Sequence, residues 1–195
     1  VHALVRMSGN ERWAWDSYRR LLSMYGRIVK DIDGRKFEAI LERYKEKTDG
    51  KRDTDLTADT LRAIVEDYKA LYRSELHADF PQKPRDQLRE AIGAVFRSWN
   101  GKRAVDYRNF NKIPHNLGTA ANVQTMVFGN LGPDSGTGVA FTRNPSTGEK
   151  QLFGEYLANA QGEDVVAGIR TPLKIAELKE RVPDLYAQFA QVAAL

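Results

Sequence analysis

The chain changes character at Phe80-Pro81-Gln82-Lys83-Pro84, a short stretch that interrupts a sequence of 195 residues. Two prolines remove backbone donors and restrict the residues before them, so a helix cannot continue through this stretch. Upstream, the apolar residues recur with a helical period, and downstream, after one more helix, they alternate as in strands. We therefore predict an α+β chain with an all-helical subdomain over residues 1–82 and a sheet-containing domain over residues 83–195.

Three helices are expected within residues 11–74. The first carries the face formed by Tyr18, Leu21, Leu22, Tyr25, Ile28 and Val29, which obeys the i, i+3, i+4, i+7 rule. Apolar positions at the same spacing predict a second helix over 37–44 and a third over 61–71, with Thr57 as its N-cap and Asp59 in its first turn. The charged stretch 47–55 between them is typical of a solvated connection. A fourth helix is expected over 88–99, ending at Asn100-Gly101.

Strand patterns dominate the rest of the chain. Alternating residues predict strands over 122–128, 138–142 and 151–157, and a further strand over 163–167. Asn144-Pro145-Ser146-Thr147-Gly148 has the residues of a hairpin loop, because Pro145 fixes φ and Gly148 accepts a positive φ. Pro172 and Pro183 each suit the first turn of a closing helix. The sequence contains neither an internal repeat nor a low-complexity stretch.

Composition excludes several classes of function. The chain has no Cys and only three His, which excludes disulfides, zinc–cysteine sites and a thiolate nucleophile. A net charge of +4 arises from 30 basic and 26 acidic residues of mixed order, whereas nucleic-acid binders usually carry a stripe of one sign. No apolar run approaches the roughly 20 residues of a membrane span, and the first residues lack the order of a signal peptide. We expect a soluble, cytoplasmic protein without nucleic-acid or membrane partners.

A candidate anion site lies in Gly132-Pro133-Asp134-Ser135-Gly136-Thr137-Gly138. Small residues leave backbone N–H groups accessible, and the hydroxyls of Ser135 and Thr137 add donors, so the stretch could cradle a phosphate. It matches neither of the common glycine-rich phosphate motifs, and a glycine-rich loop between strands is more often only a turn. Both interpretations stay open on these residues alone.

Other residues could complete such a site. Carboxylate and amide oxygens suit Mg²⁺, and they cluster at Glu155, Asn159, Gln161, Glu163 and Asp164, although a polar turn at a strand end explains them equally well.

Two arginines and two apolar residues have similar double interpretations. Arg143 and Arg170 follow strand candidates and could bind phosphate oxygens in pairs, but ordinary surface ion pairs are commoner. Met126 and Phe128 could flank an adenine ring, although apolar strand residues usually belong to a core.

Eight motifs together resemble the pyruvate phosphate dikinase family. They occur in the family's order along almost the whole chain: Ser8-Gly9-Asn10, Asp16-Ser17-Tyr18-Arg19-Arg20, Met24-Tyr25-Gly26, Val95-Phe96-Arg97-Ser98-Trp99, Leu117-Gly118-Thr119-Ala120, Met126-Val127-Phe128-Gly129-Asn130, the stretch 134–143 and the stretch 159–168. The last two, joined by Phe153-Gly154-Glu155-Tyr156-Leu157, are too long to match by chance.

The resemblance implies an enzyme that converts ATP, phosphate and pyruvate to AMP, pyrophosphate and phosphoenolpyruvate with Mg²⁺. It implies part of an ATP-grasp sheet with flanking helices, and a carrier histidine outside this chain that accepts the pyrophosphoryl group. Transferred by motif, the nucleotide-binding residues are Ser135, Gly136, Thr137, Gly138, Met126, Glu155, Gln161 and Glu163, to which the residue pattern adds Arg143. Which of them binds metal stays open.

The resemblance also implies that the chain is an internal piece of a longer enzyme. The family's upstream lysine and arginine segments, its D-x-E and L-Q-T-R motifs, its histidine domain and its barrel have no counterpart here. We therefore expect the chain alone to be inactive, to bind ATP or AMP together with the enzyme's other domains, and to self-associate through open strand edges. The alternatives are a piece of a related phosphoenolpyruvate synthase and a non-catalytic interaction module built on the helical subdomain.

Overall fold

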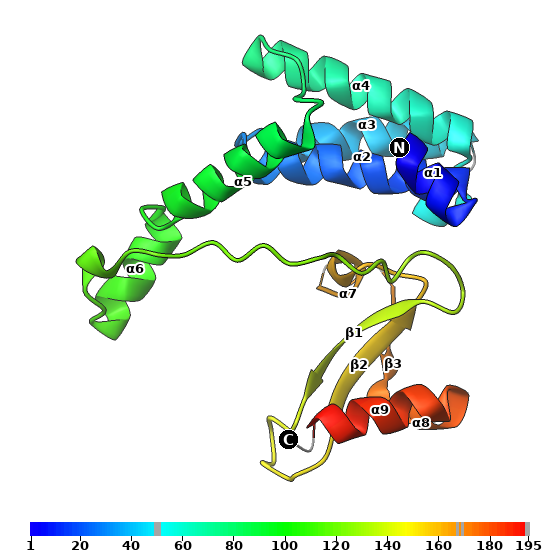
Figure 1. Cartoon of the computed structure of the whole chain (residues 1–195), viewed down its shortest axis with the longest axis vertical. Helices are drawn as coiled ribbons and strands as arrows, with labels where there is room; N and C mark the ends of the chain where they lie inside the picture. The colour runs from blue at the N-terminus through cyan, green and yellow to red at the C-terminus, as the bar shows by residue number, and fades with distance from the viewer. Residues whose placement is uncertain (49–51, 167, 169, 194–195) are drawn as a thin grey trace. The chain divides into compact units, whose positions relative to one another are not determined.

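Helices form most of the structure, and three short strands form one antiparallel sheet (Figure 1). The computed structural model describes residues 1–48, 52–166, 168 and 170–193. Its contacts divide the chain into two compact units, Val1–Gln124 and Thr125–Leu195. The predicted α+β class is confirmed. The predicted domain boundary at residues 82/83 would separate a helical subdomain from a nucleotide-binding domain, which is a different division from that between the two compact units. That boundary stays a prediction.

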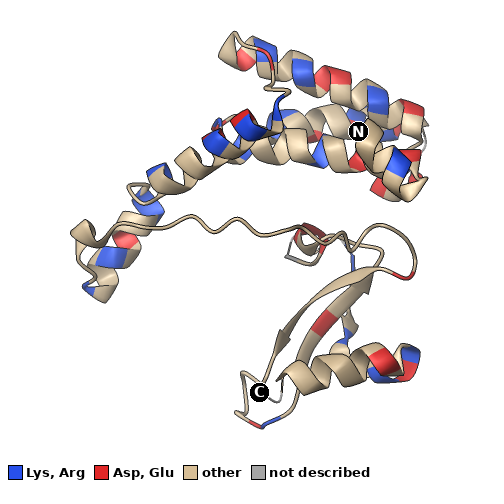
Figure 2. Cartoon of the chain, viewed as in Figure 1, with Lys and Arg blue, Asp and Glu red and all other residues tan. Residues whose placement is uncertain are grey.

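The first unit contains every predicted helix of the N-terminal half. The predicted helices correspond to α2 (Glu11–Ile28), α3 (Gly34–Thr48), α4 (Ala58–Leu76) and α5 (Pro84–Ser98). The Thr57 side chain accepts a hydrogen bond from the Thr60 N–H, which confirms the predicted N-cap of α4. Sequence reasoning missed α1 (His2–Ser8), α6 (Lys102–Asn111) and the 3₁₀ turns η1 (Asp53–Asp55) and η2 (His115–Leu117). Basic and acidic residues are interspersed along these helices (Figure 2).

The core of the first unit lies between α2, α3 and α4. Leu22, Leu61, Ile64 and Val65 are at most 1 % exposed, and each buried side chain of this size contributes about 1.5–3 kcal/mol. The predicted face of α2 is only partly buried, because Leu21 is 40 % and Ile28 70 % exposed. The apolar stripe of α2 is therefore narrower than its periodicity indicated.

Close packing of α2 against α3 depends on Gly26. A Cβ atom at Gly26 would lie 2.5 Å from the Phe37 ring, which is 2 % exposed. Phe37 in turn packs edge-on against Tyr68, whose hydroxyl donates to the Phe37 carbonyl at 3.1 Å. A glycine is therefore required on this face of α2 for the aromatic ring to reach the helix backbone.

Phe80 attaches the proline-rich stretch to the helices. Its side chain is 3 % exposed and meets Tyr25 and Tyr72 edge-on, with ring centroids 5.2 and 5.5 Å away. Edge-on aromatic pairs of this kind add to the free energy gained by burial. The residue that precedes the two prolines is thus a core residue as well as the end of the helical sequence.

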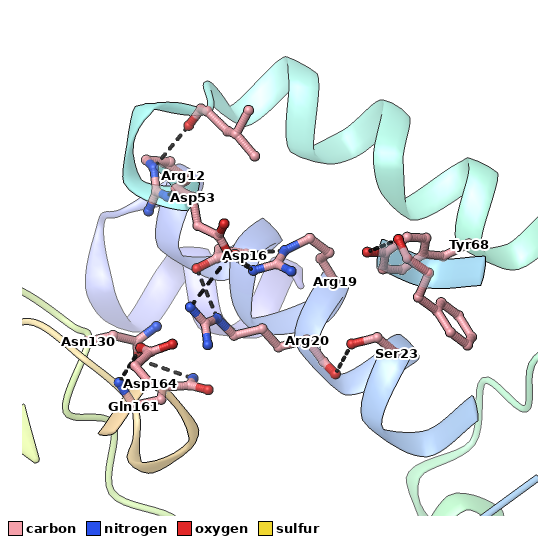
Figure 3. Close-up of polar contacts among 12 residues, drawn as sticks. Arg12, Asp16, Arg19, Arg20, Ser23, Asp53, Tyr68, Asn130, Gln161 and Asp164 are labelled. Carbon is pink, nitrogen blue, oxygen red and sulfur yellow. Dashed lines mark hydrogen bonds and ion pairs between the residues drawn. The ribbon is translucent and has the colours of Figure 1, made fainter. Parts of the chain in front are cut away.

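A buried ion cluster joins α2 to the connection before α4 (Figure 3). The Asp16 carboxylate accepts from Arg19 at 2.6 Å and from Arg20 at 3.3 Å. Asp53 Oδ2 accepts from Arg19 at 3.0 Å, and its Oδ1 lies 2.8 Å from Lys45 Nζ. The predicted solvated connection over 47–55 is therefore wrong at Asp53, whose side chain is only 25 % exposed; residues 49–51 lie outside the described part.

The second unit is a three-stranded sheet with the order β1-β2-β3. β1 (Gly136–Phe141) pairs antiparallel with β2 (Phe153–Ala158), and β2 pairs with β3 (Leu173–Lys174). Strands β1 and β2 and their hairpin loop confirm the sequence prediction. The helices α7 (Gly162–Val166), α8 (Ile175–Arg181) and α9 (Pro183–Ala193) complete the unit, with Leu157, Ile175 and Leu178 as buried apolar residues.

Three local predictions are wrong. Residues 122–128 form no strand in the structure, and Val123, Met126 and Val127 are 62, 58 and 89 % exposed. The predicted strand over 163–167 is instead helix α7 within its described residues. The helix expected from Pro172 begins later, at Ile175, because Leu173 and Lys174 pair with β2 first.

Glu90 fastens α5 to the helices, and its replacement gives a first prediction. None of the α5 side chains is fully buried, but Glu90 accepts from the Tyr25 hydroxyl and lies 2.8 Å from Lys30 Nζ. Hydrogen bonds from Lys30 and Tyr25 lower the pKa of Glu90. A lowered carboxyl pKa contributes stability above the ordinary pKa, near 4, and that contribution is lost as pH falls through the lowered value.

Glu90→Gln should therefore lower the unfolding midpoint of the first unit slightly at neutral pH, and this difference should disappear once the pH has fallen below the lowered pKa of Glu90. Because Glu90 is partly exposed, solvent screening limits the expected loss to less than about 1 kcal/mol. Urea unfolding at several pH values measures the difference, with Glu38→Gln on the exposed side of α3 as the control. A difference between wild type and Glu90→Gln that grows on acidification would contradict the assignment.

Candidate functional site

The glycine-rich loop before β1 is held against the segment that follows β2. The Ala160 N–H donates to the Gly129 carbonyl at 2.9 Å, and the Asn159 N–H donates to the Ser135 carbonyl at 2.7 Å. Within the loop, the Ser135 N–H donates to the Gly132 carbonyl at 3.1 Å. The loop is thus fixed at both ends by backbone hydrogen bonds, which leaves its small residues at the surface between them.

Gly129 allows the two segments to approach each other. A Cβ atom there would lie 2.4 Å from the Ala160 carbonyl oxygen and 2.5 Å from the Gly136 carbonyl oxygen. Both neighbours are backbone atoms and cannot rotate away. The absence of a side chain at Gly129 therefore determines how close the loop lies to residues 158–160.

Four predicted site residues follow one another where the loop enters β1. Gly136, Thr137 and Gly138 are the first residues of β1, directly after Ser135 in the preceding turn. The register pairs Thr137 with Leu157 and Val139 with Glu155. Since side chains alternate along a strand, Thr137 and Glu155 share one face of the sheet.

The turn after β2 places Gln161 and Glu163 beside this end of the sheet. Asn159 adopts the left-handed conformation with φ 47°, and Asp164 Oδ2 accepts from the Gln161 N–H at 2.8 Å. Gln161, which is 6 % exposed, donates through Nε2 to Asn130 Oδ1 at 3.2 Å (Figure 3). Thr137 Oγ1 lies 3.8 Å from the position of a Cβ on Gly162. The first turn of α7, which contains Glu163, therefore lies against the start of β1.

Two predicted residues lie elsewhere in the second unit. Arg143 follows the far end of β1 and donates to the Gly148 carbonyl at 3.0 Å in the hairpin loop. Arg143 lies five residues beyond Gly138, the last residue of the glycine-rich loop, which corresponds to roughly 16 Å along an extended chain. Met126 lies in an extended segment and is 58 % exposed, rather than on a strand. Arg170, the second arginine considered, donates to the Asn159 carbonyl at 3.0 Å.

The residues that support the loop have weaker signals in the sequence. Gly129, Asn130 and Ala160 were not among the predicted site residues, and Asp164 was considered only as an oxygen donor. Ala160 is fully buried and Asp164 is 7 % exposed, so both have structural positions under the loop. Asn159 alone indicated the turn that supports the loop, because asparagine tolerates the left-handed conformation that this turn requires.

Oxygen donors are present near the loop, but they do not form a metal site by themselves. Among the described residues, no group of three or more His, Cys, Asp or Glu gathers closely enough to hold a metal ion. One or two carboxylates near the loop could still bind Mg²⁺ if phosphate oxygens and water completed its coordination shell.

Comparison with known proteins assigns the chain to a class. A family model described as "Pyruvate phosphate dikinase, AMP/ATP-binding domain" matches residues 38–188, so the class is an AMP/ATP-binding domain. The chain belongs to the pyruvate phosphate dikinase family, since this match covers well over half of its length.

Individual relatives agree with that family. The chain is 54 % identical over 194 residues to the pyruvate, phosphate dikinase of Clostridium symbiosum, covering 99 % of this chain and 22 % of the relative. It is 53 % identical to the chloroplastic enzyme 1 of Arabidopsis thaliana, covering 98 % of this chain and 20 % of the relative. For the enzyme of Giardia intestinalis the identity is 53 %, over 91 % of this chain and 20 % of the relative. The chain thus spans about a fifth of the length of these relatives.

The helices were also compared with the requirements of a bilayer. Within the described residues, no helix combines the length and the apolar character that crossing a membrane requires.

Proposed function

We propose that the second unit contributes one side of the ATP site in an enzyme that makes phosphoenolpyruvate, AMP and pyrophosphate from pyruvate, ATP and phosphate. The observation that carries the proposal is the glycine-rich loop, fixed at Gly129 and Ser135 by backbone hydrogen bonds from Ala160 and Asn159. A fixed loop of small residues can present backbone N–H groups to phosphate oxygens without reorganising. The relatives described above are named pyruvate, phosphate dikinase, which supports this activity over that of a phosphoenolpyruvate synthase.

The site residues have different proposed roles. Gly136 and Gly138 are proposed to bind the polyphosphate through backbone N–H groups, and Ser135 and Thr137 through their hydroxyls, since the Ser135 N–H already donates to the Gly132 carbonyl. Gln161 orients the turn that adjoins the loop, through its bond to Asn130.

The peripheral site residues have weaker support. Glu155 shares the Thr137 face of the sheet and is proposed to line the cleft. Met126 is proposed to contact the adenine ring, and Arg143 is proposed to bind a phosphate group. Both side chains are exposed, so a ligand can reach them.

Mg²⁺ is the proposed metal, and the oxygen donors near the loop fit it. Glu163, in the first turn of α7, is the residue that would hold a magnesium ion brought by the nucleotide, with Glu155 as a further donor. When bound, Mg²⁺ neutralises negative charge on the phosphate oxygens. The contribution of the protein is to fix the phosphates, through the loop, in one position relative to the acceptor.

Several finer features belong to the same proposal. The sheet is proposed to be part of an ATP-grasp fold, residues 83–195 to be the nucleotide domain, and residues 1–82 its helical subdomain. The partners are ATP or AMP, the other domains of the enzyme, and a second copy in a homo-oligomer. Neither nucleic acid nor a membrane is proposed as a partner. The proposed location is cytoplasmic, although the Arabidopsis thaliana relative is named chloroplastic.

Titration of the isotope-labelled 195-residue chain with ATP and Mg²⁺ tests the proposal by nuclear magnetic resonance. Amide signals of residues 129–138 and 159–164 should shift together. Thr137→Val keeps the shape of the side chain and removes its hydroxyl, so the affinity should fall about 3- to 10-fold, as expected for one lost hydrogen bond.

Thr142→Val is the matched control, because Thr142 is exposed beyond the other end of β1. Its affinity for ATP should equal that of the wild type. Shifts confined to other parts of the chain, or equal losses for the two threonine variants, would refute the proposed site.

A further inference from the structure

An open cavity of about 730 Å³ lies in the first unit, between the end of α5 and helix α6. Its lining includes Trp99, Lys102, Arg103, Tyr107, Arg108 and Ile113. The volume falls within the range of about 300–1,000 Å³ that is typical of small-molecule sites. The charged side chains of this lining are all basic, and its aromatic residues supply flat apolar surface.

Arg108 is the one buried charged side chain among the described residues that line this cavity. It is only 3 % exposed, although it lines the cavity, and its guanidinium lies 3.9 Å from the centre of the Trp99 ring. Its Nη1 donates to the Trp99 carbonyl at 2.6 Å, and its Nε donates to His115 Nδ1 at 3.0 Å. These contacts hold the guanidinium in a single orientation and leave other N–H donors available.

The orientation is reinforced from the surrounding loop. The Trp99 indole N–H donates to the His115 carbonyl at 3.2 Å, and His115 Nε2 lies 3.0 Å from Asn109 Oδ1. The ring that supports Arg108 and the imidazole that accepts from it are thus themselves fixed. A positioned guanidinium of this kind loses little conformational entropy when it binds an oxyanion.

The charge of Arg108 is not balanced by a carboxylate. Across residues 1–48, 52–166, 168 and 170–193, no Asp or Glu forms an ion pair with Arg108 or with Arg103, and the two acceptors of Arg108, His115 Nδ1 and the Trp99 carbonyl, are neutral. Lys102 pairs with Asp106 on the exposed side of α6. Burying a cation without an opposite charge is costly, and the unpaired Arg103 beside it raises that cost. A negatively charged occupant would remove it.

We propose that this cavity binds a small organic anion in which an oxyanion, a phosphate monoester or a carboxylate, is attached to a planar apolar body. The oxyanion accepts from Arg108 inside the cavity and from Arg103 at its rim, and the planar body packs against Tyr107 and Ile113. Guanidinium groups bind both kinds of oxyanion through paired hydrogen bonds. The site belongs to the first unit and does not depend on the nucleotide site proposed above.

Titration of the labelled 195-residue chain with phenyl phosphate, benzoate, phenol and inorganic phosphate tests this proposal. Phenyl phosphate or benzoate should shift the Trp99 indole N–H signal and the amides of residues 98–113. Phenol has the ring without the charge and should bind at least about 10-fold more weakly, as for loss of a charged hydrogen-bond partner. Comparing phenyl phosphate with benzoate identifies which oxyanion the cavity prefers, and inorganic phosphate shows how much the ring contributes.

Variants separate this site from general attraction of anions. Arg103→Gln should weaken the binding of the better aryl anion about 5-fold, as an exposed charged contact would. Arg85→Gln removes the same charge from an exposed position on α5 and should leave the affinity unchanged. Arg108→Lys should weaken binding further, but it also removes contacts to Trp99, so the decision rests on the Arg103 variant.

Equal binding of phenol and phenyl phosphate, or equal losses for Arg103→Gln and Arg85→Gln, would overturn the proposal. Shifts of residues 129–138 in place of 98–113 would also overturn it, because they would assign the anion to the glycine-rich loop. The ATP titration is followed through that loop and not through Trp99, so either proposal can fail while the other stands.

Discussion

Gly129→Val is expected to disorder the loop before β1 and to reduce the affinity for ATP at least 10-fold, as for more than ~1.4 kcal/mol of lost binding free energy. The new Cβ would lie 2.4 and 2.5 Å from the carbonyl oxygens of Ala160 and Gly136, a distance that side-chain carbons do not adopt. Relief requires the loop to move away from residues 158–160. That movement breaks the hydrogen bond from the Ala160 N–H to the Gly129 carbonyl.

Gly132→Ala is the matched control within the same loop. A Cβ at Gly132 would meet only the Asp134 side chain, at 3.1 Å, and that side chain can rotate away. Amide spectra of both variants should show the first unit unchanged, and only Gly129→Val should lose the native signals of residues 129–138. If the valine variant kept both these signals and its ATP affinity, the loop would not depend on this approach.

Helices α2 to α5 were predictable because each of them carries its own signals in the sequence, whereas α1 and α6 were missed. Thr57 caps α4 through a bond to a residue three positions ahead, and the apolar residues of α4 repeat with a helical period. Such contacts are local in sequence. The burial of Phe80 was not predictable, because its partners Tyr25 and Tyr72 lie on two other helices.

Strands could be predicted only where the partner strand lies nearby in sequence. β1 and β2 are joined by one hairpin loop, and both were recognised. Residues 122–128 have an equally good alternating pattern but belong to neither of the two strand pairs of the sheet, and they do not form a strand. The pattern at 163–167 was outweighed by the Asp164 carboxylate, which accepts from the Gln161 N–H and begins α7.

In the candidate site, too, the local features could be predicted from the sequence and the contacts between distant segments could not. Small residues and hydroxyls made the loop at 135–138 visible in the sequence, because their chemistry is a property of single residues. Gly129 and Ala160 support that loop through a contact between segments about 30 residues apart, and nothing in either segment alone indicates the other.

Asp16→Asn is expected to destabilise the first unit by about 3–5 kcal/mol, the usual cost of removing one partner from a buried ion cluster. The Asp16 side chain is 5 % exposed and accepts from Arg19 at 2.9 and 2.6 Å. Asparagine fits the same space but removes one of the carboxylates that balance the buried charges of Arg19 and Arg20, while Asp53 still pairs with both. Urea unfolding, followed by the fluorescence of Trp13 and Trp15 on α2, measures the loss.

Asp106→Asn is the control, since its exposed i,i+4 pair with Lys102 should contribute about 0.5 kcal/mol or less. The double variant Asp16→Asn, Arg19→Met should lose less free energy of unfolding than the two single variants added together. The reason is that the double variant buries one positive charge fewer than Asp16→Asn alone.

Acid should have a related effect through Asp53. Burial raises the pKa of Asp53, but Arg19 and Lys45 lower it more, so the net shift is downward. This carboxylate therefore stabilises the unit above its ordinary pKa, near 4, and the contribution is lost as pH falls through the lowered value. Asp53→Asn should remove that part of the acid dependence.

Additive effects of Asp16→Asn and Arg19→Met, or a loss for Asp16→Asn no larger than for Asp106→Asn, would show that Asp16, Arg19, Arg20 and Asp53 do not act as one buried charge cluster.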